Sequence, residues 1–184
     1  MPRFPDLSPD QMTEAQKRVA EAIASGPRGG IRGPFAVLLR SPELADRVQK
    51  LGEHLRFRSS LPPRLNEFAI IINARFWESK YEWFAHRPLA VKAGLADAIA
   101  DAVAKGQRPE GMEGMKEDEA LVYDFCTALH RRHFVDESLF ERAMTVLGEQ
   151  GVVDLIGVSG YYTLVSMVLN VAEIPLPAGT PPPW

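Results

Sequence analysis

The chain has 184 residues, of which 46% are hydrophobic and 24% are charged. This composition is typical of one globular domain with a sizeable core and excludes a disordered chain. The net charge is −3 and no long basic run occurs, so the sequence offers no surface for nucleic acid. We therefore expect a small-molecule or protein partner.

The cellular location is inferred from the single cysteine and from the N-terminus. Cys126 has no partner for an internal disulfide, and Met1 to Pro9 lack the charged start and apolar run of a secretion signal. The stretch Val152 to Val171 approaches the length of a membrane span, but Asp154 and Asn170 interrupt it. We expect a cytoplasmic protein with no membrane anchor.

The first part of the chain predicts two amphipathic helices separated by a loop. Residues 9–25 carry apolar side chains at helical spacing, and the helix ends at Gly26. Residues 26–33 are too rich in glycine for a helix, and we expect a loop that covers or borders a site. The next helix begins at Ser41, and its packing stripe consists of Leu44, Val48, Leu51 and Leu55.

The central and C-terminal parts predict further helices. Leu65 to Trp77 is apolar on most faces, as expected of a helix surrounded by protein. Helices follow over Ser79–Ala93, Ala96–Ala104, Glu117–His133, a segment with Asp136 as N-cap, and Val152–Val171; Gln107–Lys116 is a polar loop and residues 175–184 are a proline-rich tail. No strand alternation occurs. The prediction is an all-α single domain over residues 1–184, with about eight helices and a core at about residues 33–175.

Three ionisable side chains lie in two strongly apolar segments of this helical pattern: Glu67, Glu82 and His86. A buried carboxylate keeps its proton to higher pH, and an imidazole beside it titrates near neutrality. Glu82 and His86 are four residues apart and share one helix face, while Glu67 can approach from the preceding helix if the two pack antiparallel. The pattern predicts proton transfer, with His86 as acid and Glu67 orienting it or storing a proton.

Each of these residues also has a purely structural interpretation. Ser79 and Glu82 match the Ser-x-x-Glu pattern of a capping box. Glu67 is also compatible with a buried ion pair to an arginine such as Arg64 or Arg75, and His86 with a core histidine. We keep these alternatives open at this stage.

Metal and cofactor sites have little support in the sequence. His130 and His133 are three residues apart near Asp136, but cations at a helix C-terminus explain them better than a metal site does. No phosphate loop, dinucleotide fingerprint or nucleophile elbow occurs in the chain. We expect no metal and no organic cofactor.

The segment from Glu67 through Tyr81–His86 to Ala93-Gly94-Leu95 resembles the carboxymuconolactone decarboxylase family. Flanking segments are also similar to long members of that family: Gly33-Pro34-Phe35, Ser41-Pro42-Glu43-Leu44, and Gly160-Tyr161-Tyr162 with Asn170. Together they span about Gly33 to Pro175. The resemblance implies an alkyl hydroperoxidase D-like fold that assembles as trimers or hexamers, with a glutamate, a Cys-x-x-Cys pair and a histidine in its site.

This sequence departs from that pattern at the two cysteines. The motif's glutamate corresponds to Glu67 and its histidine to His86, but Ser79 and Glu82 occupy the cysteine positions. Peroxide reduction of this type needs one thiolate to attack and a second thiol to resolve the product. Cys126 lies on an apolar stripe and is expected to be a buried core thiol. A peroxiredoxin-like antioxidant activity is therefore the disfavoured alternative.

The non-redox branch of the family implies a cofactor-free carboxy-lyase acting on a small unsaturated lactone or keto acid. In this interpretation Arg75 anchors a substrate carboxylate, while Tyr81, Ser79 and Trp77 line the substrate site. Loss of carbon dioxide leaves an electron pair that a nearby donor stabilises, and a general acid then returns a proton to carbon. A non-catalytic, oligomeric protein that binds a small ligand is the other alternative.

Overall fold

The computed structural model describes residues 3–109, 111 and 114–184, and in this part of the chain the fold contains eight α-helices and no strand. A short 3₁₀ helix, η1 (Pro9–Gln11), precedes α1 (Glu14–Ser25), α2 (Pro34–Leu38), α3 (Pro42–Phe57), α4 (Pro63–Phe76), α5 (Lys80–Lys92), α6 (Asp97–Ala104), α7 (Glu117–Arg132) and α8 (Glu137–Ala172). The predicted all-α class is confirmed. Parts of the predicted N-terminal segment and of the predicted loop Gln107–Lys116 lie outside the described residues.

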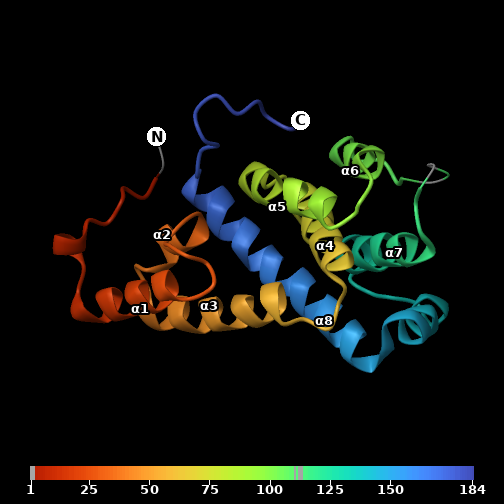
Figure 1. Ribbon diagram of the computed structural model, residues 1–184, viewed down its shortest axis with the longest axis horizontal. Coiled ribbons are helices and arrows are strands. Elements are labelled where there is room, and N and C mark those ends of the chain that lie inside the picture. The colour runs from red at the N-terminus through yellow and green to blue at the C-terminus, as the bar shows by residue number, and fades with distance from the viewer. Residues whose placement is uncertain (1–2, 110, 112–113) are drawn as a thin grey trace.

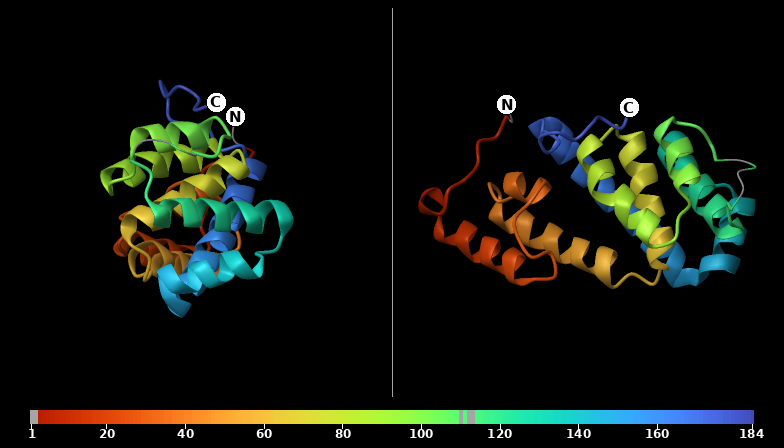
Figure 2. Two further views of the ribbon diagram at one scale, coloured as in Figure 1. Left: turned by 90° about the vertical axis from the view of Figure 1, so that its right-hand side faces the viewer. Right: turned by 45° about the horizontal axis from the view of Figure 1, so that its top comes forward.

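Helix α4 is the centre of the fold. Its sequence is apolar around most of its circumference, and Phe68, Ile70 and Ile71 have no exposed surface. It packs most extensively against α5 and also contacts α6, α7 and α8. Helix α8 crosses the molecule, with α1, α2 and α3 on one side of it and α4 to α7 on the other (Figures 1 and 2). One continuous core joins the two sides, because Ile23 of α1 and the buried residues of α4 belong to the same cluster of packed apolar side chains.

The connection between α4 and α5 is a tight turn. Glu78 adopts a left-handed conformation there (φ 51°), and α5 begins at Lys80. The predicted capping box is wrong: the Ser79 side chain makes no capping hydrogen bond, and its buried Oγ has no hydrogen-bond partner among the described residues. Glu82 instead extends toward His86, one turn further along α5. The turn therefore leaves the Glu82 carboxyl group available to the site.

Helix α3 buries a face that differs from the predicted stripe. Val48 and Leu55 are buried as expected, but Leu44 and Leu51 are 46% and 51% exposed. The buried face includes Gly52, where α3 lies against a side chain of α8. Because a glycine lets the helices approach closely, the contact centres on Gly52 and turns Leu44 and Leu51 toward the surface.

Helix α8 consists of two segments that meet at Gly148 (φ 70°, ψ 173°). Its predicted N-cap is confirmed, because Asp136 accepts a hydrogen bond of 3.1 Å from the backbone N–H of Leu139. By length and composition α8 is the one described helix that is able to cross a membrane, and 56% of its most apolar window is buried inside the protein. A core helix of a soluble protein passes the same test, so this finding is weak evidence for a membrane span.

Candidate functional site

The pair formed by Glu67 and His86 is the first element of the candidate site. Glu67 belongs to α4 and His86 to α5, and the packing of these two helices brings Glu67 Oε2 to 2.6 Å from His86 Nδ1. Both side chains are largely buried, with 12% and 5% of their surface exposed. The predicted approach of Glu67 to His86 from the preceding helix is confirmed.

Glu82 lies on the other side of the imidazole ring. Its Oε2 is 3.4 Å from His86 Nε2, and this buried oxygen makes no hydrogen bond with the described residues. Burial raises the pKa of the Glu82 carboxyl group above its ordinary value, because the loss of hydration outweighs the opposing attraction of His86. Glu82 is thus biased toward its protonated form.

The two ring nitrogens of His86 therefore face two carboxyl groups in different environments. When Nδ1 donates its proton to Glu67, Nε2 carries a lone pair and faces Glu82. A protonated Glu82 is then able to supply a proton to Nε2 or to a ligand. Tyr162 packs edge-on against the imidazole, with ring centroids 5.1 Å apart, and limits its movement. This arrangement is suited to moving protons.

A cavity of about 290 Å³ opens next to Glu82 and His86. Residues of α5 and α8 line it, together with the glycine-rich segment 26–33, the start of α2 and the end of α3. The side chains that line it and bear polar groups are Arg28, Arg32, Arg56, Tyr81, Glu82, His86, Tyr161 and Tyr162. The expectation that the glycine-rich segment borders a site agrees with this geometry.

Arg28 is the most firmly held cation of the cavity. Its Nη2 donates a hydrogen bond of 3.3 Å to Tyr161 Oη, and its guanidinium carbon lies 4.6 Å from the ring centroid of Phe35. The positive charges of Arg28 and Arg56 both act to lower the pKa of Glu82, although burial outweighs them. The cavity is therefore cationic, which favours an anionic ligand.

Close packing around two glycines shapes the cavity. Gly33 (φ 56°) is the N-cap of α2, and a Cβ at this position would come within 2.8 Å of the Tyr81 ring. A Cβ on Gly52 would overlap both the Tyr161 hydroxyl group and the Arg28 guanidinium. A side chain at either position would displace groups that line the cavity.

Tyr81 lines this cavity as predicted, but three other predicted substrate-binding residues lie elsewhere. Arg75 Nε donates to the carbonyl oxygen of Ala104 at 2.8 Å, and its guanidinium lies over the ring of Trp184. Trp77 donates from Nε1 to Thr163 Oγ1 at 3.1 Å, which joins α4 to α8. Ser79 is fully buried in the turn between α4 and α5. The prediction that these three form part of the site around His86 is not supported by their positions.

The ion-pair interpretation of Glu67 is wrong, because both proposed arginine partners are engaged elsewhere. Arg64 pairs with Asp118 at 2.7 Å and also with Glu119, and so links α4 to α7. Arg75 contacts Glu78 at 3.5 Å. The ionisable partner of Glu67 is His86 instead, and a carboxylate in contact with an imidazole is an arrangement that is able to transfer protons.

Sequence reasoning did not assign site roles to Arg28, Arg32, Arg56, Tyr161 or Tyr162. Two signals were present: a segment too rich in glycine for a helix nevertheless carries two arginines, and two adjacent tyrosines occur on an apolar helix. Neither signal specifies a distance to His86. Only the packing of α4 against α5 and α8, and of α3 against α8, brings these residues together.

Cys126 and the two histidines at the end of α7 lie outside this cavity. Cys126 is fully buried, its Sγ is 3.7 Å from Ser159 Oγ, and burial raises the pKa of its thiol to about 12. The predicted core thiol is confirmed.

The two histidines at the end of α7 differ in environment. His133 is the C-cap of α7, whereas the ring of His130 stacks on Phe76. Burial lowers the pKa of His130, so the interpretation of both histidines as cations is wrong for His130. Among the described residues no group of side chains is arranged to hold a metal ion.

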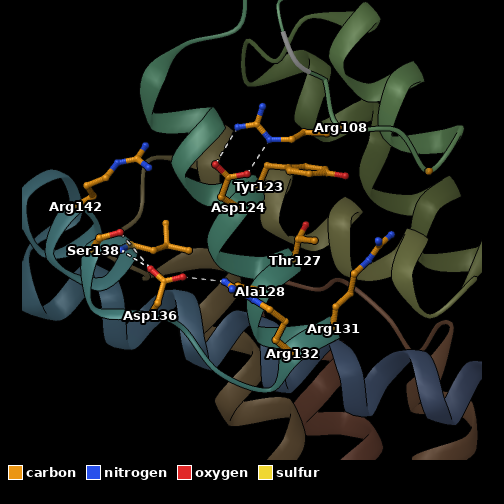
Figure 3. Close-up of a pocket in the computed structure, with 12 residues that line it drawn as sticks. Arg108, Tyr123, Asp124, Thr127, Ala128, Arg131, Arg132, Asp136, Ser138 and Arg142 are labelled. Carbon is orange, nitrogen blue, oxygen red and sulfur yellow. Dashed lines mark hydrogen bonds and ion pairs between the residues drawn. The ribbon is translucent and has the colours of Figure 1, made fainter.

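A second cavity, of about 520 Å³, lies between α7 and the start of α8 (Figure 3). Several arginines line it, but two of them are paired with carboxylates: Arg108 with Asp124 through two hydrogen bonds of 2.9 Å, and Arg132 with Asp136 at 3.1 Å. It contains no carboxyl–imidazole pair. We therefore place the candidate site at the cavity beside His86.

Comparison with models of known protein families found no match, and comparison with curated proteins found none. The assignment of function therefore depends on the site itself and on the sequence resemblance described above.

Proposed function

We propose that this protein is a carboxymuconolactone decarboxylase-like carboxy-lyase that acts on a small unsaturated lactone or keto acid. The observation that supports it best is the position of His86 between the carboxyl groups of Glu67 and Glu82, at 2.6 Å and 3.4 Å. An acid and a base in direct contact at a cationic cavity are the groups that such a reaction requires.

The proposed reaction begins with binding of an anionic substrate among the arginines of the cavity. The bond between carbon and the departing carboxylate then breaks, carbon dioxide leaves, and the electron pair moves into the unsaturated carbonyl system. Tyr81, Tyr161 and the nearby guanidinium groups are the donors available to stabilise the resulting oxyanion. No electron acceptor is needed, because the electrons remain in the substrate.

The final proposed step returns a proton to carbon. Glu82 is the preferred source, since its pKa is raised by burial and it lines the cavity. After Glu82 has given its proton to carbon, Nε2 of His86 takes up a proton from solvent, and Glu67 stabilises the imidazolium that forms transiently. The imidazolium then passes this proton from Nε2 to the Glu82 carboxylate. This scheme refines the sequence-based prediction, in which His86 itself was the acid, and it requires neither a metal nor an organic cofactor.

A peroxidase function receives no support from the thiol. A thiolate is the reactive form of cysteine, and a thiol with a pKa of about 12 is almost entirely protonated at neutral pH. Cys126 also lies outside the cavity of His86. We therefore favour the carboxy-lyase over the antioxidant alternative.

We further propose a cytoplasmic homo-oligomer. Helix α8 has a row of exposed apolar side chains along the face that includes Val153, Ile156, Met167 and Val171, with exposures of 66%, 48%, 43% and 59%. Exposed apolar patches of this kind are typical of subunit contacts. Light scattering during gel filtration tests this proposal, and a monomer at micromolar concentration would contradict it.

The experiment that tests the reaction follows carbon dioxide release from 4-carboxymuconolactone and related unsaturated lactone acids. We expect release by the wild type without added metal or thiol, and a loss of about 10²-fold or more in His86→Ala. His133→Asn, at the exposed end of α7, is the matched control and keeps full activity. Equal release by wild type and His86→Ala would refute the proposed role of His86, and no release from any candidate would refute the substrate class.

A further inference from the structure

We propose that Arg28 is the specificity-determining residue of the cavity beside His86, and that it binds a second anionic group of the ligand, remote from the group that lies against Glu82 and His86. The inference deepens the proposed function and rests on it for the reaction, but not for binding. A ligand with two anionic groups at opposite ends is the chemical class implied.

The first observation is how Arg28 reaches the cavity. It lies in segment 26–33, outside any helix, where Gly29 and Gly30 adopt positive φ angles of 66° and 156°. Few residues other than glycine adopt such conformations, so the backbone path of this segment depends on them. This path carries Arg28 to Tyr161, a residue 133 positions away in sequence. The two glycines therefore allow the left-handed backbone conformation that directs Arg28 toward the cavity.

The second observation is that Arg28 is held in place but not fully paired. Phe35 packs against the flat side of the guanidinium, and Tyr161 accepts one of its N–H groups. Arg28 Nε is buried and has no hydrogen-bond partner among the described residues. A buried donor without an acceptor costs free energy, which an incoming carboxylate would recover by forming a charge-assisted hydrogen bond.

Arg28 is distinguished from the other two arginines of the cavity by these contacts. Arg32 is exposed. The guanidinium of Arg56 lies 5.1 Å from the ring centroid of Phe57, a side chain that is 44% exposed. We expect Arg32 and Arg56 to contribute a general positive potential, which attracts any anion, whereas the fixed guanidinium of Arg28 selects where a carboxylate binds.

The test uses two probes of the same length, trans,trans-muconate with a carboxylate at each end and sorbate with one carboxylate and one methyl group. Both are small enough to be compared in a cavity of about 290 Å³. Isothermal titration with the full chain gives the Kd of each. We expect the wild type to prefer muconate about tenfold or more, and Arg28→Gln to lose this preference with little change in the Kd of sorbate.

Three further variants separate recognition from a merely structural effect. Tyr161→Phe removes the hydroxyl group that accepts from Arg28 but keeps the ring, and it is expected to retain the preference for muconate. Arg56→Gln is expected to weaken both probes alike, and Arg47→Gln, on the exposed surface of α3, to change neither. If Arg28→Gln does not fold, Arg28→Ala with added methylguanidinium replaces it, and the added cation should restore the preference.

The inference is overturned if the wild type binds both probes equally, or if Arg28→Gln keeps the preference for muconate. It is also overturned if Arg56→Gln alone abolishes that preference. Its failure is distinguishable from failure of the proposed reaction, because His86→Ala should still prefer muconate. A preference that depends on Arg28, together with no carbon dioxide release from any candidate, would retain the ligand class and refute the carboxy-lyase.

Discussion

Glu67 Oε2 lies 2.6 Å from His86 Nδ1, although the two residues belong to different helices and are 19 positions apart in sequence. The contact fixes which ring nitrogen faces Glu67 and leaves the other nitrogen facing Glu82. It also explains why the buried carboxylate of Glu67 needs no arginine partner. The predicted consequences of this arrangement and of the packing around it are open to direct measurement.

Replacement of Glu67 by glutamine keeps the shape of the side chain and removes its charge. If Glu67 stabilises the imidazolium formed during turnover, kcat in Glu67→Gln should fall by about 10²-fold or more, with little change in KM. Steady-state carbon dioxide release measures both constants. Glu21→Gln, on the exposed side of α1, serves as the control. A kcat within a few-fold of the wild type would remove Glu67 from the mechanism.

The buried carboxyl group of Glu82 predicts a pH dependence of stability. Burial raises its pKa in the folded state above the ordinary value of 4.5, so the folded protein keeps a proton that the unfolded chain has already released. The contribution of Glu82 to stability is therefore full below pH 4.5 and declines as the pH rises through the raised pKa.

This pH dependence is measured as the free energy of unfolding in urea from pH 4 to pH 8. Above pH 4.5 the wild type should lose stability relative to Glu82→Gln, which has no proton to release. Glu21→Gln is the control, because the side chain of Glu21 is exposed and forms no ion pair among the described residues. Parallel curves for the wild type and Glu82→Gln would show that the folded-state pKa of Glu82 is not raised.

Gly52 lies where α3 packs against Tyr161 of α8, and even a methyl group there would overlap Tyr161 and Arg28. We expect Gly52→Ala to destabilise the protein by about 1–3 kcal/mol, as overpacking of a core does, and to weaken muconate binding. Thermal unfolding measures the first effect. Gly160→Ala is the matched control: no atom lies within 4 Å of a Cβ there, so it should be neutral or slightly stabilising. Equal stability of the two variants would contradict the described packing.

Cys126 should resist alkylation while the protein is folded. With a pKa of about 12, only about one molecule in 10⁴ carries the thiolate at pH 8, and the group is also fully buried. Iodoacetamide labelling followed by mass spectrometry should therefore be complete in urea and negligible in the native protein. Rapid native labelling, or peroxide turnover that is lost in Cys126→Ser, would revive the antioxidant alternative.

Much of the fold was predictable because the formation of a helix depends mainly on residues that are close together in the sequence. Apolar side chains at spacings of three and four residues predicted the helices, and the N-cap of α8 at Asp136 was identified from its residue type and position. The same spacing placed Glu82 and His86 on one face of α5. Local patterns failed at the start of α5, where the Ser-x-x-Glu pattern predicted a capping box. Ser79 makes no capping hydrogen bond there, and the side chain of Glu82 extends toward His86 instead.

The sequence by itself determined the all-α class, the burial of Cys126 and the grouping of Glu67, Glu82 and His86, because these depend on hydrophobicity and on separations of a few residues or of one helical hairpin. The tertiary structure alone decided which cations complete the cavity. Arg28 and Arg56 line the cavity and Arg75 does not, because α3 packs against α8 while α4 packs against α5 and α8. Contacts between residues as distant in sequence as Arg28 and Tyr161 leave no periodic signal, since the packing of whole helices sets them.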